Sequence, residues 1–335
     1  MSIFKLLLAA ALTTSAAQTK TIKFATLAPE GSTWMKVMNE LNAELQEKTG
    51  GGLKFKMYPG GISGDEKDVV RKVRIGQLQA AGFTGVGLGE IAPELRILDG
   101  PWLFRNHAEV DHVYKAFEKE FNVAIEKSGY VLLGWTELGF VYLFSRIAIN
   151  GPRDMRKAKM WVWEGDPIAE AAYQALDASP IPLSVVDVMS SLQTGLIDTV
   201  YGPPMGVIAL QWFTRTKYIY PVPLAHSVGA ILISKKFFDG LPQQHGKILT
   251  EVGAKHLRRL TELARAENEQ AMASLQKQGL VLLRQPSAET LKLYEELGRK
   301  ARRALSGRLY SAALLQGVEK SLEDLRKNSK ESSRR

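Results

Sequence analysis

The sequence predicts a two-lobed α/β protein with a mixed sheet in each lobe, a chain that crosses between the lobes, and a long bracing helix. Strand-like and helix-like segments alternate along the chain, which is typical of sheets covered by helices. The chain has 335 residues, which is too long for one ordinary core and suits two domains. A long segment without proline near the C-terminus indicates a helix that extends beyond one lobe.

The alternation starts in the first part of the chain. Residues 21–27 form a short β-rich run, and a loop then leads to Ser32, a candidate N-cap. Apolar residues recur at helical spacing from there to Gly50, which lies where a helix stop is expected. Residues 53–58 alternate like a strand, and a second helix begins at Asp65.

The middle of the chain repeats this pattern. Strand-like runs occupy residues 130–135, 141–149, 159–163 and 196–201. Helical periodicity occupies residues 167–176 and 185–193. Glycine and proline separate these segments without forming a flexible linker or a repeat, so we expect the chain to pass between the lobes more than once.

The segment from Pro242 to Gln278 predicts the longest helix. It contains no proline after Pro242, and its apolar residues lie among abundant Ala, Glu, Gln, Arg and Lys. A helix over residues 242–278 would extend roughly 50 Å at about 1.5 Å per residue, which is enough to brace both lobes. Two shorter helices that break at Gly253 are the alternative.

These elements predict an organisation in four parts after an export signal. Residues 18–143 together with residues 228–255 would form lobe I, and residues 144–227 would form lobe II. The long helix over residues 242–278 would span both lobes. Residues 279–335 would form C-terminal helices with a basic tail.

The first residues indicate export from the cytoplasm. Lys5 precedes the apolar run 6–12, and small residues follow up to Ala17. This pattern is typical of a signal peptide that is cut near Ala17, so we expect residues 1–17 to be removed and the protein to be periplasmic. A buried N-terminal helix is the alternative.

The charge and cysteine content exclude several classes of function. The net charge is +9, but Lys and Arg are spread among Asp and Glu, and no basic run is interleaved with aromatic residues. We therefore expect no nucleic-acid partner. The chain has no cysteine, which excludes a thiol nucleophile, a thiolate metal site and disulfides.

The sequence also lacks a set of catalytic groups. Its five histidines are scattered, without the spacing that places two imidazoles on one helix face. There is no Gly-x-Ser-x-Gly motif, and Gly85–Gly89 lacks the dinucleotide fingerprint. The sequence predicts no enzyme, no cofactor and no metal site.

Aromatic residues are the most distinctive candidates for a binding site. Trp161 and Trp163 share one face of a predicted strand, because side chains alternate along a strand. A polar loop follows them directly, and in open α/β sheets ligands bind where strands end. Trp34 and Trp212 follow other strand-like runs. Packing of these indoles in the core or between domains is the alternative.

Six segments resemble one protein family. They are residues 24–34 (FATLAPEGSTW), 58–66 (YPGGISGDE), 74–78 (RIGQL), 100–104 (GPWLF) with His107, 155–162 (MRKAKMWV) and 191–198 (SLQTGLID). Their order and spacing resemble those of the extracytoplasmic solute-binding proteins of TRAP transporters, the tripartite ATP-independent periplasmic class, in its dicarboxylate-binding, DctP-like branch. The resemblance covers nearly the whole mature chain.

The resemblance implies a fold and a mode of action. It implies the two-lobed periplasmic-binding-protein fold, with a ligand cleft between lobes that close by a hinge motion. The partners it implies are a small organic ligand and the membrane permease subunits of a TRAP transporter, driven by an ion gradient. Whether an accessory periplasmic protein also takes part is left open.

The chain departs from the family at its ligand-clamping positions. The family arginine that binds a ligand carboxylate corresponds to Trp161. A second family arginine follows a Gly-Phe-like pair, and this chain has no basic residue after that pair before Arg146. The expected asparagine corresponds to Gly202. Since a buried carboxylate without a cation is costly, we hypothesise a ligand that is less acidic and more apolar than the family norm, that is, apolar or weakly acidic. It would be held against Trp161, Phe140 and their neighbours.

Two alternatives stay open at this point. A carboxylate ligand could be held by backbone NH groups and by Lys159 or Arg146. The chain could also be the binding protein of an ATP-driven importer, which would share the lobes and the export signal. The candidate ligand-binding residues are Leu27, Trp34, Phe83, Thr84, Phe140, Val141, Tyr142, Trp161, Trp163, Tyr201, Gly202 and Trp212.

Overall fold

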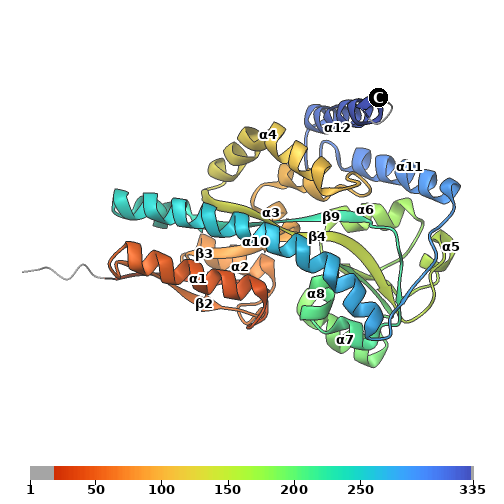
Figure 1. Ribbon diagram of the computed structural model, residues 1–335, viewed down its shortest axis with the longest axis horizontal. Coiled ribbons are helices and arrows are strands. Elements are labelled where there is room, and N and C mark those ends of the chain that lie inside the picture. Colours follow the sequence, from red (N-terminus) through yellow and green to blue (C-terminus); the bar gives the residue numbers. More distant parts are fainter. Residues whose placement is uncertain (1–18, 333–335) are drawn as a thin grey trace, which may run out of the picture.

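The computed structural model describes residues 19–332 (Figure 1). The predicted signal peptide and its cut near Ala17 lie outside the described residues. No helix in the described range combines the length and hydropathy that are needed to cross a membrane.

One strand, β4, belongs to both lobes. An eight-stranded sheet has the order β10-β8-β4-β9-β3-β1-β2, and β7 pairs with β4 beside this path. The strands are β1 (Lys20–Ala25), β2 (Leu53–Tyr58), β3 (Ala80–Thr84), β4 (Tyr130–Ser145), β7 (Thr199–Gly202), β8 (Tyr218–Ile219), β9 (Ala225–Ser234) and β10 (Val281–Leu282). A separate parallel pair consists of β5 (Trp161–Trp163) and β6 (Ile181–Leu183).

The pairing of β4 divides the sheet. Residues 130–141 of β4 pair antiparallel with β9, and residues 142–145 pair with β7. We call the part built on β2, β1, β3, β9 and the start of β4 lobe I. Lobe II is the part built on the end of β4 with β7, β8, β10 and the β5–β6 pair. Parallel and antiparallel neighbours both occur, so the predicted mixed sheet is confirmed.

Helices cover the sheet on both sides. They are α1 (Thr33–Lys48), α2 (Glu66–Arg74), α3 (Gly85–Ile91), α4 (His107–Lys127), α5 (Pro152–Met155), α6 (Pro167–Ala175), α7 (Val188–Thr194), α8 (Pro204–Ala209), α9 (Lys235–Asp239), α10 (Gln243–Lys277), α11 (Ala288–Leu305) and α12 (Ala312–Ser332). Short 3₁₀ helices span Pro93–Asp99, Val185–Asp187 and Trp212–Arg215.

The N-terminal elements form where local signals place them. The Ser32 side chain accepts a hydrogen bond from the backbone NH of Met35 and caps α1. Asp65 caps α2 by accepting from the NH of Glu66. Two predicted strand-like runs, residues 130–135 and 141–149, are instead one strand, because β-bulges between Leu132 and Gly139 let β4 bend without breaking.

Helix α10 is continuous through Gly253 and passes along both lobes. In Figure 1 it runs across the molecule beside α1 at one end and α8 at the other, and it packs on β4 between them. Its 35 residues correspond to roughly 50 Å. A Cβ atom at Gly253 would lie 3.0 Å from the carbonyl oxygen of Leu133, so the helix approaches β4 closely at this point.

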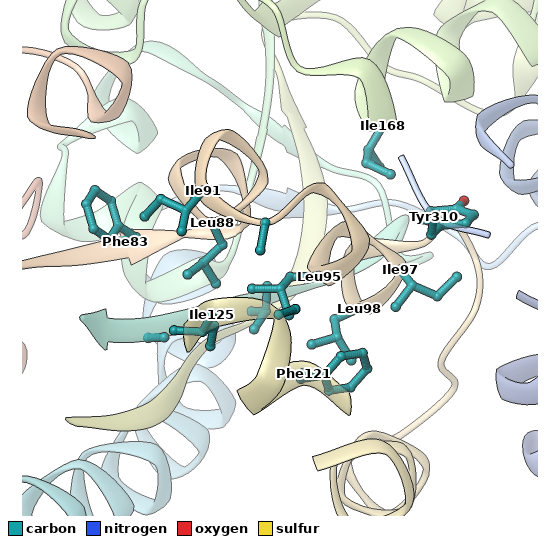
Figure 2. Close-up of a cluster of buried hydrophobic side chains, with 14 of the residues drawn as sticks. Phe83, Leu88, Ile91, Leu95, Ile97, Leu98, Phe121, Ile125, Ile168 and Tyr310 are labelled. Carbon is teal, nitrogen blue, oxygen red and sulfur yellow. The ribbon is translucent and has the colours of Figure 1, made fainter. Parts of the chain in front are cut away.

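The 3₁₀ helix Pro93–Asp99 matters most for the site. Leu95, Ile97 and Leu98 are buried in the largest apolar cluster of lobe I (Figure 2). Because side chains three residues apart in a 3₁₀ helix lie above one another, Arg96 and Asp99 share the remaining face. Ile168 of α6 packs into the same cluster, so lobe II contacts the lobe I core here.

The contact between α10 and β4 gives the first prediction. We expect Gly253→Val to lower the free energy of unfolding by about 2 kcal/mol, because the added branches overlap the backbone of β4. The control is Ala254→Val, which places the same side chain on the exposed face of α10. Urea titration of both variants checks this, and equal effects would contradict the close approach.

Candidate ligand-binding cleft

A cavity of about 400 Å³ lies between the lobes. Lobe I contributes the loop after β1, the end of β3 and the 3₁₀ helix Pro93–Asp99. Lobe II contributes β5, the start of α6, and the segment from Tyr201 to Trp212. The volume falls in the range of pockets that enclose small organic ligands.

An aromatic cluster supports the lobe II wall. Trp161 stacks on Tyr201 with ring centroids 4.7 Å apart, and Trp212 meets it edge-on at 5.3 Å. The Trp161 indole NH donates to the carbonyl oxygen of Leu183 at 3.0 Å. Only 1% of Trp161 is exposed, so its ring supports the wall from behind and is not an open stacking platform.

The surface that a ligand can reach comes from other apolar side chains. Among the lining residues, those that keep partial exposure include Leu27, Trp34, Trp102, Leu138, Met189, Met205, Leu210 and Leu224. Six of these eight, all but Leu27 and Trp34, were not among the sequence candidates. Single apolar residues in loops and at strand ends carry no pattern of their own, and only the fold brings them together.

Among the described residues, Arg96 is the one arginine or lysine that lines the cavity, and it is paired; the histidine His226 lines the cavity as well. The Arg96 Nη2 atom donates to Asp166 Oδ1 at 2.6 Å, and its Nε atom lies 3.3 Å from Asp99 Oδ2. Only 3% of Arg96 is exposed. Glu66 is a third lining carboxyl group. The lining therefore carries three acidic side chains against one arginine.

Burial affects two of these acids. Burial raises the pKa of Glu66 to about 7, although its carboxyl group accepts hydrogen bonds from Thr84 and from the NH of Gly87. Burial likewise raises the pKa of Asp99 to about 6, against the attraction of Arg96. Both groups are thus anchored by lobe I and carry weakened negative charge near neutral pH.

Asp65 connects the two lobes. In addition to capping α2, its carboxylate accepts from the Trp163 indole NH at 3.0 Å and from Ser184 Oγ at 2.5 Å. The backbone NH of Val185 is 3.3 Å from the same oxygen. Together with the Arg96–Asp166 pair, these contacts hold the two lobes against each other.

Ten of the twelve sequence candidates line the cavity. They are Leu27, Trp34, Phe83, Thr84, Val141, Trp161, Trp163, Tyr201, Gly202 and Trp212. The other two, Phe140 and Tyr142, do not, because side chains alternate along β4 and Val141 faces the cavity between them. Phe140 packs against His107 and His226, with centroids 5.1 Å and 5.4 Å away.

The two cations that the sequence offered for a carboxylate ligand lie elsewhere. Lys159 is exposed, and its Nζ donates to the carbonyl oxygen of Gly195 at 3.2 Å. Arg146 is also exposed. Neither side chain lines the cavity.

At the edge of the cavity, which His226 lines, the fold gathers His107, Glu137 and His226 from three different elements. Donor atoms of the three lie within 4.8 Å of one another, a juxtaposition that the scattered spacing of the histidines did not reveal. Both Glu137 oxygens already accept from Arg265, at 2.5 Å and 3.1 Å, and His226 hydrogen-bonds to Glu137 at 3.0 Å. The cluster is thus a partly buried ion-pair network that ties α10 to β4 and β9.

This network predicts a dependence of stability on pH. Burial alone would raise the pKa of Glu137, but hydrogen bonds from His226 and Arg265 outweigh it and lower the pKa to about 2. Because the pKa of Glu137 is lower in the folded state, the group stabilises the fold when the pH is above its pKa in the unfolded chain, near 4.5. This stabilisation is lost as the pH falls toward 2.

We therefore expect Glu137→Gln to lower the free energy of unfolding by about 3 kcal/mol above pH 5. The loss should become smaller as the pH is lowered toward 3. Urea titrations at pH 7, 5, 4 and 3 measure this cost. The control is Glu262→Gln, an exposed position on the same helix as Arg265, which should have little effect at any pH. A cost for Glu137→Gln that does not change with pH would contradict the assignment.

Comparisons with known proteins agree with this geometry. Residues 24–305 match the family model for bacterial extracellular solute-binding proteins, family 7, DctP. A solute-binding protein of Verminephrobacter eiseniae is 27% identical over 59% of this chain and 60% of its own length. The 2,3-diketo-L-gulonate-binding periplasmic protein YiaO of Escherichia coli is 26% identical over 72% of this chain and 74% of its own length.

A solved structure has the same fold. The sugar acid binding protein DctPAm from Advenella mimigardefordensis, in complex with galactonate, has a TM-score of 0.85 at 20% identity. The match covers 91% of this chain and 98% of that one. The two-lobed fold is thereby confirmed, and the family consists of solute-binding receptors rather than enzymes. The chain belongs to the bacterial extracellular solute-binding protein family 7, the DctP family of TRAP transporters.

Proposed function

We propose that this protein captures a small, largely apolar organic molecule between its lobes and delivers it to an ion-gradient-driven TRAP permease. The observation that carries the proposal is the chemistry of the cavity lining. Leucine, methionine and tryptophan side chains supply much of its partly exposed surface, beside a few neutral polar groups such as Ser32, Thr84 and Asn268. Its one arginine is paired with two carboxylates of the protein itself. Delivery to the permease follows from the family to which the chain belongs.

An acidic ligand is the second candidate, because relatives bind acids. YiaO is a 2,3-diketo-L-gulonate-binding protein, and DctPAm holds galactonate. In this chain a ligand carboxylate would enter a site with three acidic side chains, and Lys159 and Arg146 lie outside it. Removing a carboxylate from water without a free cation or several donors costs several kcal/mol, so we favour the apolar ligand.

The first experiment identifies what the protein holds when it is purified from the periplasm. We expect native mass spectrometry, followed by release of the ligand in denaturant, to show a neutral or weakly acidic organic molecule. A sugar acid or dicarboxylate in stoichiometric amount would contradict the proposal.

The second experiment compares benzamide with benzoate in isothermal titration. The two molecules have nearly the same shape and differ in charge, so their affinity ratio measures the preference for a neutral ligand. We expect benzamide to bind at least tenfold more tightly than benzoate, and succinate and galactonate not to bind in the micromolar range. Micromolar binding of these acids, with benzamide weaker, would overturn the proposal.

The apolar wall can be tested with a matched pair of variants. Leu138→Ala removes one partly exposed lining side chain and should weaken benzamide binding by about tenfold, which corresponds to roughly 1.5 kcal/mol of lost burial. Leu196→Ala makes the same change at an exposed position that does not line the cavity, and it should leave binding unchanged. Equal losses in both variants would point to an effect on folding.

A further inference from the structure

The buried Arg96–Asp166 ion pair joins the two lobes at the cavity. Arg96 belongs to the 3₁₀ helix Pro93–Asp99 of lobe I, whose apolar neighbours anchor it in the core. Asp166 follows β5 of lobe II and begins α6. The side chains of both residues are less than a tenth exposed. The pair therefore exists in this form only when the lobes are together.

The geometry of the pair decides what Arg96 can still bind. A guanidinium grips a carboxylate through two adjacent NH groups, either Nε with Nη2 or Nη1 with Nη2. Nη2 belongs to both of these edges, and it donates to Asp166 at 2.6 Å. The Nε atom lies 3.3 Å from Asp99 Oδ2. A ligand carboxylate would therefore approach a guanidinium that already has one carboxylate at Nη2 and a second beside Nε, and these weaken its attraction for a third.

Both carboxylates are held in place by the backbone. Asp166 Oδ1 also accepts from the NH of Ile168 at 3.0 Å and caps α6, where the helix dipole favours a negative charge. Asp99 Oδ1 accepts from the NH of Val228 at 3.0 Å. An acidic ligand would have to displace a preorganised side chain that is covalently tethered and already correctly oriented.

We propose that Asp166 is a specificity-determining residue that excludes acidic ligands by occupying Arg96 when the lobes close. The proposal rests on the proposed function, because it explains at the level of one residue why the cleft prefers an uncharged molecule. An acid that reached Arg96 would have to expel Asp166, and this would oppose closure of the lobes around it.

The test replaces Asp166 without removing its structural role. Asp166→Asn keeps an oxygen that can accept from the NH of Ile168, and asparagine caps helices as well as aspartate does. The substitution removes one negative charge beside Arg96. The matched control is Asp187→Asn, which removes an exposed carboxylate of the same lobe.

Isothermal titration with benzoate, benzamide, succinate and galactonate measures the effect in the full mature chain. We expect Asp166→Asn to strengthen the binding of at least one of the three acids tenfold or more, and to lower the benzamide-to-benzoate affinity ratio by a similar factor. A second variant, Asp99→Asn combined with Asp166→Asn, should shift the ratio further in the same direction. Asp187→Asn should leave it unchanged.

The outcomes separate this inference from the proposed function. Micromolar binding of acids by the unchanged protein would overturn both. A second outcome is that the unchanged protein binds no acid and that Asp166→Asn gains no affinity for any acid either. If the circular dichroism spectrum shows that this variant is folded, the inference alone fails. If Asp166→Asn unfolds, Asp99→Asn by itself decides, since it relieves the same guanidinium from the lobe I side.

Discussion

The pairing of β4 with strands of both lobes is the constraint on which the rest of the molecule depends. Because one continuous strand joins β9 in lobe I to β7 in lobe II, the lobes cannot separate without bending it. Its bulges, together with Gly139 at a φ of 108°, supply the places where it bends. Helix α10 packs along β4 and contacts elements of both lobes, so it accompanies the strand across the lobe boundary.

The cleft combines apolar surface with charged side chains that are already paired with one another. Arg96 and Asp99 reach the cavity because the other face of their 3₁₀ helix is buried in the core, and Asp166 reaches it because it caps α6. The cost of burying these charges is offset inside the protein, since each has a partner across the lobe boundary or on the backbone. Little charge is left over to attract an anion.

Much of the fold follows from short-range signals in the sequence. The Ser32 and Asp65 caps, the alternation of residues 53–58 and the long run without proline after Pro242 each act locally, so they could be predicted. Of the ten candidate residues that line the cavity, Thr84, Trp163 and Gly202 end strands and Leu27 follows one, which is where ligands of α/β sheets are expected. Arg96 could not be predicted as a lining residue because its partner Asp166 lies 70 positions away in the sequence. Phe140 was predicted to line the cavity but faces away from it, because the bulges of β4 decide which side chains share a face.

The contact between Trp163 and Asp65 has an optical consequence. The Trp163 indole is 8% exposed and donates across the lobe boundary to a carboxylate, so separation of the lobes would bring water to a ring that is now dry. Indole emission shifts to longer wavelength when the ring becomes hydrated. The protein thus carries a natural fluorophore at the boundary of its two lobes, and opening would shift its contribution to the emission of the six tryptophans.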